Sequence, residues 1–320
     1  MNKFFVIICI TIMIFGFSCK KGDDRGSGAD NRITISGAWA LYPMVVKWAS
    51  EYQKQHPSII IDISAGGAGK GMTDALTGTV DLGMVSRDVY KAEIDKGAWW
   101  ISVVKDAVIP VINAENPLKE TLLKRGLSRK EFTRIWITDA IRDWNTFIKS
   151  DTTYRIHIYT RSDACGAAET WAKYVGGSQE DLKGVGVYGD PGLADAVRND
   201  LLGIGYNNVN FAYDASTEKP VRGILILPID INANGMIDPQ ENFYADRDSL
   251  IAAIADGRYP SPPARDLHLV SHGVPRKKEV ARFLVWILGE GQKYISEAGY
   301  IALPAERLIK QTASLAGAAQ

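Results

Sequence analysis

The stretch that decides the fold runs from residue 32 to residue 71 and reads RITISGAWALYPMVVKWASEYQKQHPSIIIDISAGGAGKG. It predicts a strand over 32–36, a helix over 41–55 whose apolar residues recur at helical spacing, and a second strand over 58–64. A glycine loop follows and opens a second helix over 72–77. Strands that alternate with helices predict an α/β protein with a parallel sheet covered on both faces.

The same alternation continues to the C-terminus. About 290 residues follow the N-terminal segment, which suggests two domains on length alone. We expect further strands over 80–85, 107–113, 155–160, 204–213, 221–229 and 266–271, and helices over 119–125, 129–136, 165–174, 192–202, 249–255, 277–288 and 291–299.

The N-terminus predicts export. A positively charged start at Lys3 precedes an apolar run over residues 4–17, and Ser18 precedes Cys19. This is the pattern of a signal peptide, and the run is shorter than the roughly 20 residues of a membrane span. Residues 16–19 resemble the lipobox of bacterial lipoproteins. We therefore expect removal of residues 1–18, acylation of Cys19, a flexible tether over 19–31, and a lipid-anchored protein on the extracytoplasmic side of the cell envelope. An ordinary signal with an incidental cysteine stays open.

The charge balance and the cysteine content bear on nucleic-acid binding and on disulfide bonds. Lys and Arg total 37, as do Asp and Glu, so nothing in the charge favours nucleic acid as a partner. Of three cysteines, Cys9 is lost with the signal, which leaves Cys165 in the body and no internal disulfide framework.

Three strand-to-helix junctions could hold an anion. They span residues 36–43, 66–71 and 161–167, and each places small residues where a helix begins. The first N–H groups of a helix lack internal partners and carry the positive end of its dipole, so small residues there let an anion approach closely. Arg161 can add a two-pronged bond to an oxyanion, and Asp163 is expected to orient it.

These junctions carry a specific resemblance. Residues 35–89 resemble the N-terminal part of the phosphate-binding proteins of phosphate ABC transporters, through Ser36-Gly37, Tyr42-Pro43, Lys47-Trp48, the glycine loop and the run DLGMVSR at 81–87. Further similarity lies at 161–167, at GIGY (203–206), at GEGQ (289–292) and at AGYIAL (298–303). It spans nearly the whole chain and is weakest over 227–263.

The resemblance implies a type II periplasmic-binding fold, with two α/β lobes, two crossings of the chain and a ligand cleft between the lobes. Lobe 1 would comprise 32–112 and 266–320, and lobe 2 would comprise 113–265. The protein would be a monomer that passes phosphate or a related oxyanion to an ABC transporter permease. The ligand-binding residues implied are Ala38, Trp39, Ala40, Leu41, Ala68, Gly69, Ser86, Arg87, Arg161, Asp163, Cys165, Gly166 and Ala167.

Several positions depart from the family pattern. Cys165 and Ala167 stand where the family offers hydroxyls, and Ala68 stands where it usually has Ser. Some members use an Asp that accepts the proton of hydrogen phosphate, and that position here is Arg87. A buried acceptor repels sulfate, so its loss leaves sulfate, tungstate and molybdate open as ligands. We expect Arg87 to supply charge instead, and a surface ion pair is the alternative.

Residues 230–241, DINANGMIDPQE, match a twelve-residue EF-hand loop at every constrained position. Gly235 allows the sharp turn at position six, and Ile237 is the apolar residue at position eight. We expect a structural Ca²⁺ in an insertion of lobe 2; an ion-free polar turn is the alternative. Its ligands would be Asp230, Asn232, Asn234, Met236 through its backbone, Asp238 and Glu241.

Two other classes of protein remain open. Cys165 at a helix N-terminus beside Arg161 could be a nucleophile, but none of the four histidines forms a recognisable pair with it. A protein that is not an enzyme is therefore expected. A signalling or adhesion lipoprotein that kept the fold is the third class, and the alanines in the anion loops are its support.

Overall fold

The computed structural model describes residues 31–148 and 151–315. The expected signal peptide, Cys19 and all of the tether before residue 31 lie outside the described residues. Within the described ranges, no helix combines the length and the apolar character needed to cross a membrane.

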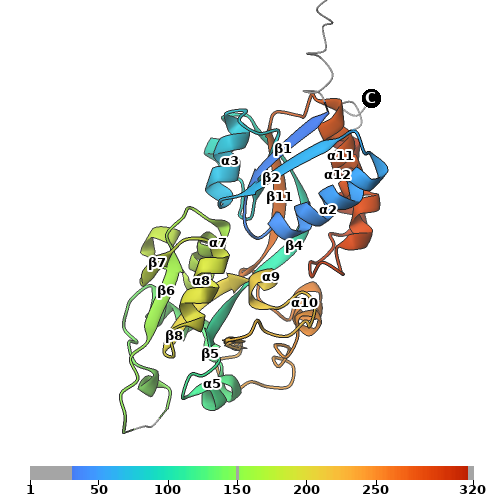
Figure 1. Ribbon diagram of the computed structural model, residues 1–320. Coiled ribbons are helices and arrows are strands. Elements are labelled where there is room, and N and C mark those ends of the chain that lie inside the picture. Colours follow the sequence, from blue (N-terminus) through green and yellow to red (C-terminus); the bar gives the residue numbers. More distant parts are fainter. Residues whose placement is uncertain (1–30, 149–150, 316–320) are drawn as a thin grey trace, which may run out of the picture.

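The chain forms two lobes, one above the other in Figure 1. One main sheet of nine strands runs through both, in the order β2-β1-β3-β11-β4-β8-β6-β7, with β9 also paired to β4. The elements of lobe 1 are β1 (Arg32–Gly37), α2 (Tyr42–Gln55), β2 (Ile60–Ala65), α3 (Ala68–Leu76), β3 (Leu82–Val85), α4 (Lys91–Ile94), α11 (Lys278–Leu288), the 3-10 helix η3 (Glu290–Tyr294) and α12 (Ala305–Leu315).

Lobe 2 holds the middle of the chain. Its strands are β5 (Leu127–Ser128), β6 (His157–Arg161), β7 (Val185–Val187), β8 (Gly203–Asn208), β9 (Ile224–Ile226) and β10 (Ile229–Asp230). Its helices are α5 (Lys119–Arg125), α6 (Arg129–Trp136), α7 (Gly166–Val175), α8 (Gly189–Arg198), α9 (Val209–Ala212) and α10 (Arg247–Ala255), with 3-10 turns η1 (Trp144–Thr146) and η2 (Gln179–Asp181).

Two strands cross between the lobes. β4 (Ala98–Asn113) and β11 (Ala264–His272) pair antiparallel; β11 also pairs with β3 of lobe 1, and β4 with β8 of lobe 2. Each lobe has its own buried core, and along β4 the two cores meet between Val104 and Ala107. The structural division on β4 therefore falls a few residues before the expected boundary at 112/113.

The sheet is mixed, although the sequence predicted a parallel one. β1, β2 and β3 pair in parallel, as do β6, β7 and β8, but both crossing strands run antiparallel to their neighbours. The first crossing strand is sixteen residues long, whereas the prediction covered only 107–113. Lys105 and Asp106 interrupt its apolar pattern, and only the tertiary fold shows that Asp106 is buried.

The other differences lie at element ends and in elements that the sequence did not predict. β8 ends at Asn208 where the predicted strand continued to 213, because α9 begins at once. The predicted helix at 291–299 is only the 3-10 helix η3, and α12 was not predicted. Helices α5 and α6 match the predicted ranges. At α6 the sequence is explicit, since Ser128 and Glu131 form a capping box in which the Ser128 N–H donates to the Glu131 carboxylate at 2.8 Å.

Candidate functional site

The anion loops of the two lobes lie directly against each other. The β2–α3 loop of lobe 1 meets the β6–α7 loop of lobe 2, and the Gly69 N–H donates to the Ala164 carbonyl at 3.1 Å. A Cβ at Gly67 would lie 2.8 Å from that same carbonyl oxygen. Glycine is therefore required at Gly67 by the closeness of the opposite lobe, and also by its positive φ of 89°.

A second close contact joins the end of β3 to the start of α7. A Cβ at Gly166 would collide with both the carbonyl oxygen and the hydroxyl of Ser86. A third contact is aromatic: the Trp39 ring of lobe 1 meets Tyr188 and Phe211 of lobe 2 edge-on, with centroids 6.4 and 6.2 Å apart. The structure thus has the two lobes closed on each other.

Arg161 is the buried cation of this interface. Its side chain is only 1% exposed, and it leaves the end of β6 at the start of the β6–α7 loop. Its Nε and Nη2 donate to the two oxygens of Asp163 at 2.7 and 2.6 Å, and its Nη1 donates to Asp190 at 2.6 Å. Burial lowers the pKa of Arg161, but the charge of Asp190 and the other groups around it outweigh burial and raise it, so the guanidinium stays charged.

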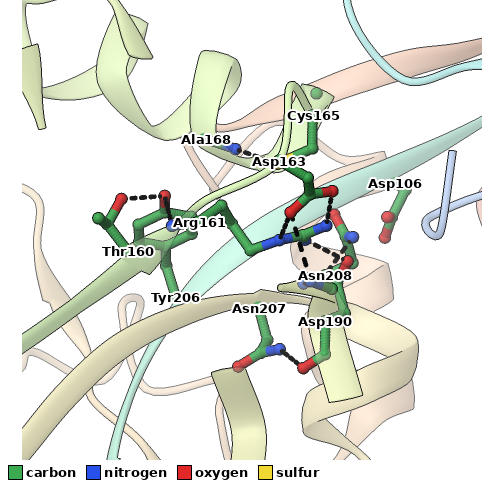
Figure 2. A network of polar contacts seen from close by, with 12 residues as sticks. Asp106, Thr160, Arg161, Asp163, Cys165, Ala168, Asp190, Tyr206, Asn207 and Asn208 are labelled. Atoms are coloured by element: carbon green, nitrogen blue, oxygen red, sulfur yellow. Dashed lines mark hydrogen bonds and ion pairs between the residues drawn. The ribbon is translucent and has the colours of Figure 1, made fainter. Parts of the chain in front are cut away.

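The second carboxylate partner of Arg161 is itself held in place. Asp190, in the first turn of α8, accepts the N–H and the side-chain amide of Asn208 at 3.1 and 2.8 Å (Figure 2). Its backbone carbonyl accepts the Asn207 amide at 2.9 Å. Asp190 is fixed from the end of β8, and it fixes Arg161 in turn.

Several helix starts at the interface carry buried N–H groups without a partner. Among the predicted site residues that the structure describes, Ala40, Ala68, Gly166 and Ala167 are buried at or just before a helix start, and their backbone N–H groups donate to no protein acceptor. A buried N–H almost always has a partner, so these four call for acceptor oxygens from outside the chain. By contrast, the N–H groups of four other predicted residues are used inside the protein, namely Ala38, Leu41, Gly69 and Cys165.

Two charged residues of the crossing strands lie beside this network. Asp106 on β4 and Arg265 on β11 are register partners, with an oxygen of Asp106 and Nη2 of Arg265 3.9 Å apart. Arg265 donates to the Gly166 carbonyl at 2.8 Å and to the Asn208 side chain, so it joins the loop of α7 to the end of β8. In Figure 2, Asp106 stands beside the network with no dashed line to it.

Asp106 has an unusual environment for a carboxyl group. It is 1% exposed, and among the described residues neither oxygen makes a hydrogen bond of good geometry. Burial raises its pKa to about 7, against the positive charge of Arg265, which lowers it. Asp106 can therefore gain or lose a proton near neutral pH.

The Arg87 guanidinium is paired with a carboxylate of its own lobe and not with the anion loops. Its Nη1 and Nη2 donate to both oxygens of Glu93 at 2.9 and 2.7 Å, and its guanidinium lies 4.2 Å from the centre of the Tyr90 ring. The ion pair considered as the alternative reading of Arg87 is thus present. Arg87 also lines a cavity of about 550 Å³ between the lobes, together with Lys105, Lys173, Arg265, His268 and Arg307.

Cys165 has the structural features of a helix cap. It is 5% exposed, and its sulfur accepts the Ala168 N–H at 3.4 Å as the N-cap of α7. Burial raises the pKa of the thiol to about 12, and the charge of Arg161 only partly opposes this. A thiol held neutral in this way is a poor nucleophile.

The sequence reasoning missed four residues of the network: Asp106, Asp190, Asn208 and Arg265. Asp106 carried a weak signal, because a carboxyl group next to an apolar strand is uncommon. Asp190 lies immediately before Pro191 at a helix start, which is ordinary for a solvent-exposed cap. Only the fold brings these positions to Arg161.

Comparison with known proteins places this geometry in a family. Residues 24–290 match the family described as PBP superfamily domain. The chain is 24% identical over 354 aligned residues to phosphate-binding protein PstS of Methanocaldococcus jannaschii, covering 93% of this chain and 90% of the relative. It is 26% identical over 313 residues to the PstS of Haemophilus influenzae, covering 86% and 90%.

Solved structures agree on the fold. An ABC-type phosphate transport receptor from Vibrio cholerae superposes with a TM-score of 0.61 at 18% identity, covering 85% of this chain and all of that one. A high affinity periplasmic phosphate-binding protein bound with phosphate gives a TM-score of 0.68 at 14% identity, covering 88% and 93%. The two lobes and two crossing strands confirm the predicted type II fold, and since the family match covers well over half of the chain, this protein belongs to the PBP superfamily.

Proposed function

We propose that this protein is the extracytoplasmic solute-binding component of an ABC importer and that it captures inorganic phosphate between its lobes. The relatives named phosphate-binding protein PstS support this assignment over most of the chain's length. The observation that carries it is the set of unpartnered, buried N–H groups at the starts of α2, α3 and α7, next to a buried guanidinium.

Arg161 has donor capacity left for a ligand. A guanidinium carries five N–H groups, and three of them donate to Asp163 and Asp190, so two remain. Together with the four free backbone N–H groups they offer six donors from both lobes. A tetrahedral oxyanion has acceptor lone pairs in all directions, so one bound ion can satisfy donors that no side chain reaches.

This arrangement also explains why the loops can lack hydroxyl groups. Ala68 and Ala167 stand where the family offers Ser or Thr, but in both residues it is the backbone N–H that lacks a partner. The small side chains keep the space in front of those N–H groups open. Loss of the hydroxyls therefore leaves the backbone part of the anion site intact.

Asp106 supports phosphate over sulfate. The buried cluster contains two cations, Arg161 and Arg265, and three carboxyl groups, of which Asp106 is the one whose oxygens make no hydrogen bond of good geometry. In its charged form Asp106 would accept a hydrogen bond from the P–OH group of hydrogen phosphate, and sulfate has no such hydrogen to donate at neutral pH. Asp106, on the crossing strand, would thus take the part that the sequence alignment could not assign to Arg87.

The route to the membrane belongs to the same proposal. The sequence of residues 1–19 resembles the signal and lipobox of an exported lipoprotein, so Cys19 would anchor the protein to the extracytoplasmic face and the two lobes would deliver phosphate to a permease. Catalysis has no part in it, because the buried neutral thiol of Cys165 lacks an activating base. Incorporation of a labelled fatty acid that is lost in Cys19→Ser would test the anchor.

The test of the function is calorimetric titration of the purified protein with phosphate, sulfate, tungstate and molybdate at pH 6 and pH 8. We expect tight binding of phosphate, with at least a 100-fold weaker response to sulfate. Preference for sulfate, tungstate or molybdate would keep the anion site and replace its ligand. No binding of any oxyanion would overturn the proposal and favour a signalling role for the same fold.

A further inference from the structure

The loop at residues 230–241 lies apart from the anion site and has no role in the proposed function. It begins at β10, whose two residues pair in parallel with β5 in lobe 2, away from the lobe interface. It ends shortly before α10. Phosphate binding therefore does not explain the sequence of this loop.

The acidic side chains of the loop point into its centre. Asp230 accepts the N–H groups of Asn234 and Gly235 at 3.2 and 2.8 Å. Glu241, eleven positions later, reaches back across the loop, and its Oε1 accepts the N–H groups of Ile231 and Asn232 at 3.0 and 3.1 Å. The first and twelfth residues of the loop are thus folded onto one interior.

Two of these carboxylates are buried, and no cation neutralises them. Asp230 is 2% exposed and Glu241 is 4% exposed. Among the described residues, no Lys, Arg or His forms an ion pair with either of them or with Asp238. A buried negative charge is costly unless a positive charge compensates it, so this interior is electrostatically incomplete.

The loop also contains neutral side chains with oxygen atoms that can bind a metal ion, namely the amides of Asn232 and Asn234. The side-chain N–H groups of Asn232 and Asn234 donate to the same oxygen of Asp238 at 2.7 and 2.9 Å. Their amide oxygens accept the backbone N–H groups of Asn234 and Met236 at 3.0 and 2.9 Å, so both amide oxygens also lie within the loop. The described residues hold no group of three His, Cys, Asp or Glu side chains arranged as a metal site, so an ion here would depend on amides and a backbone carbonyl as well. Ligands that are all oxygens, some of them neutral, suit Ca²⁺ and not Zn²⁺ or Cu²⁺.

The motif fits beyond its acidic positions. Gly235 has φ of 85°, as the sharp turn at position six requires, and nothing in the structure but this conformation demands a glycine there. Ile237, at position eight, packs on Gly126, and its N–H donates to the Lys124 carbonyl at 2.9 Å. Ile237, which binds no ion in such a motif, thus attaches the loop to the C-terminal end of α5.

We propose that residues 230–241 bind one Ca²⁺ ion, with oxygens from Asp230, Asn232, Asn234, Met236, Asp238 and Glu241, and that the ion fixes this loop to lobe 2. A strand enters the loop, so it is not the helix–loop–helix of a calcium sensor. Its attachments also favour a fixed structure: the Ile229 N–H donates to the Tyr244 hydroxyl at 3.1 Å, and Tyr213 donates to the Tyr244 carbonyl at 2.8 Å. The ion is structural, and an affinity of about 0.1 to 1 mM would suffice outside the cell.

The test is a calcium titration of the chelator-treated protein in the absence of phosphate, followed by calorimetry and by Tm. We expect one site per chain and a rise in Tm of about 3 to 8 °C at 5 mM CaCl₂, with a much smaller rise for MgCl₂. Glu241→Gln should weaken calcium binding at least tenfold. Glu120→Gln, an exposed acid on the neighbouring helix α5, is the matched control and should bind calcium as the parent does.

A parent protein that shows neither heat nor a Tm change up to 10 mM CaCl₂ would overturn the proposal, as would unchanged binding in Glu241→Gln. If Glu241→Gln fails to fold, Asp238→Asn replaces it, because Asp238 is only partly buried. Phosphate binding is measured separately in calcium and in chelator. The proposal of a phosphate site is therefore tested independently of the proposal of a calcium site.

Discussion

The carboxyl group of Asp106 and the guanidinium of Arg265 face each other across the two strands that connect the lobes, 3.9 Å apart. Both side chains are buried, and Arg265 also contacts the first residue of α7 and the last residue of β8. Burial lowers the pKa of Arg265 and raises that of Asp106 to about 7. A buried carboxyl and guanidinium pair thus lies on the two strands that connect the lobes within the described residues.

Asp106 should make stability depend on pH. Its pKa in the folded protein lies above its ordinary value of 3.8, so the folded state holds the proton more tightly than the unfolded state does. Its contribution to stability is therefore largest below about pH 4 and falls as the pH rises towards about 7. In Asp106→Asn this slope should be reduced, so the variant gains stability relative to the parent as the pH rises from 4 to 8, measured by urea unfolding. Parallel pH profiles of the two proteins would contradict this account.

Asp106→Asn should also change ligand preference. An amide at this position cannot accept the proton of hydrogen phosphate as a carboxylate does, and it no longer repels sulfate. We expect weaker phosphate binding and a ratio of sulfate to phosphate affinity that rises at least tenfold at pH 8, by calorimetry. A ratio that stays within threefold of the parent's would remove Asp106 from the selectivity of the site.

Gly166→Ala should hold the lobes apart. The added methyl group would meet the backbone carbonyl and the hydroxyl of Ser86 in the opposite lobe, and the carbonyl cannot withdraw without moving the end of β3. We expect phosphate affinity to fall at least tenfold with little change in Tm, and small-angle X-ray scattering with phosphate should show a more extended protein. Gly289→Ala is the control, because its Cβ would meet only ordinary contacts from 3.4 Å outward. Equal phosphate affinity in Gly166→Ala and Gly289→Ala would show that the close contact between Gly166 and Ser86 is not needed for phosphate binding.

Arg161→Lys should lose most of the phosphate affinity. A lysine keeps the charge but cannot bond both oxygens of Asp163, reach Asp190 and still present two N–H groups to an anion. A loss of about 2 to 4 kcal/mol, or roughly 30- to 1000-fold in Kd, is expected from calorimetry, with a lower Tm as well. Arg142→Lys, whose side chain is exposed and pairs only with Asp139, should leave both quantities unchanged. Near-parental phosphate binding by the Lys variant would remove Arg161 from the site.

Arg87→Gln separates the two interpretations of that residue. Because both terminal nitrogens of the Arg87 guanidinium donate to Glu93, we expect phosphate affinity within threefold of the parent's. The same titration gives the answer. A loss approaching that of Arg161→Lys would instead show that Arg87 turns to the ligand and supplies the charge first expected of it.

Cys165 should behave as a buried capping residue. With a thiol pKa of about 12, almost no thiolate is present at pH 8, so reaction with 5,5′-dithiobis(2-nitrobenzoate) should be slow in the folded protein and fast in urea. Cys165→Ser should keep phosphate binding, since a hydroxyl caps α7 at least as well as a thiol does. Rapid labelling of the folded protein would reopen the question of a nucleophile.

The sequence by itself determined the local elements and the identity of the anion loops. Helical periodicity predicted α2, α5 and α6, because their apolar faces meet a core and the period is written in the residues. Small residues at the starts of α3 and α7, and Arg161 before α7, marked the site because helix N-termini need partners. The twelve-residue loop likewise carries its ion pattern in a single continuous segment.

Only the tertiary structure decided which distant residues share the site. Asp190 and Asn208 reach Arg161 because β6 and β8 are neighbours in the sheet, and Asp106 meets Arg265 because β4 and β11 cross together, 159 positions apart in the chain. The tertiary structure also decided that Arg87 forms an ion pair with Glu93 and that the Cys165 thiol stays neutral. Burial and pairing depend on what the rest of the chain places around a group, and no local pattern of residues encodes that.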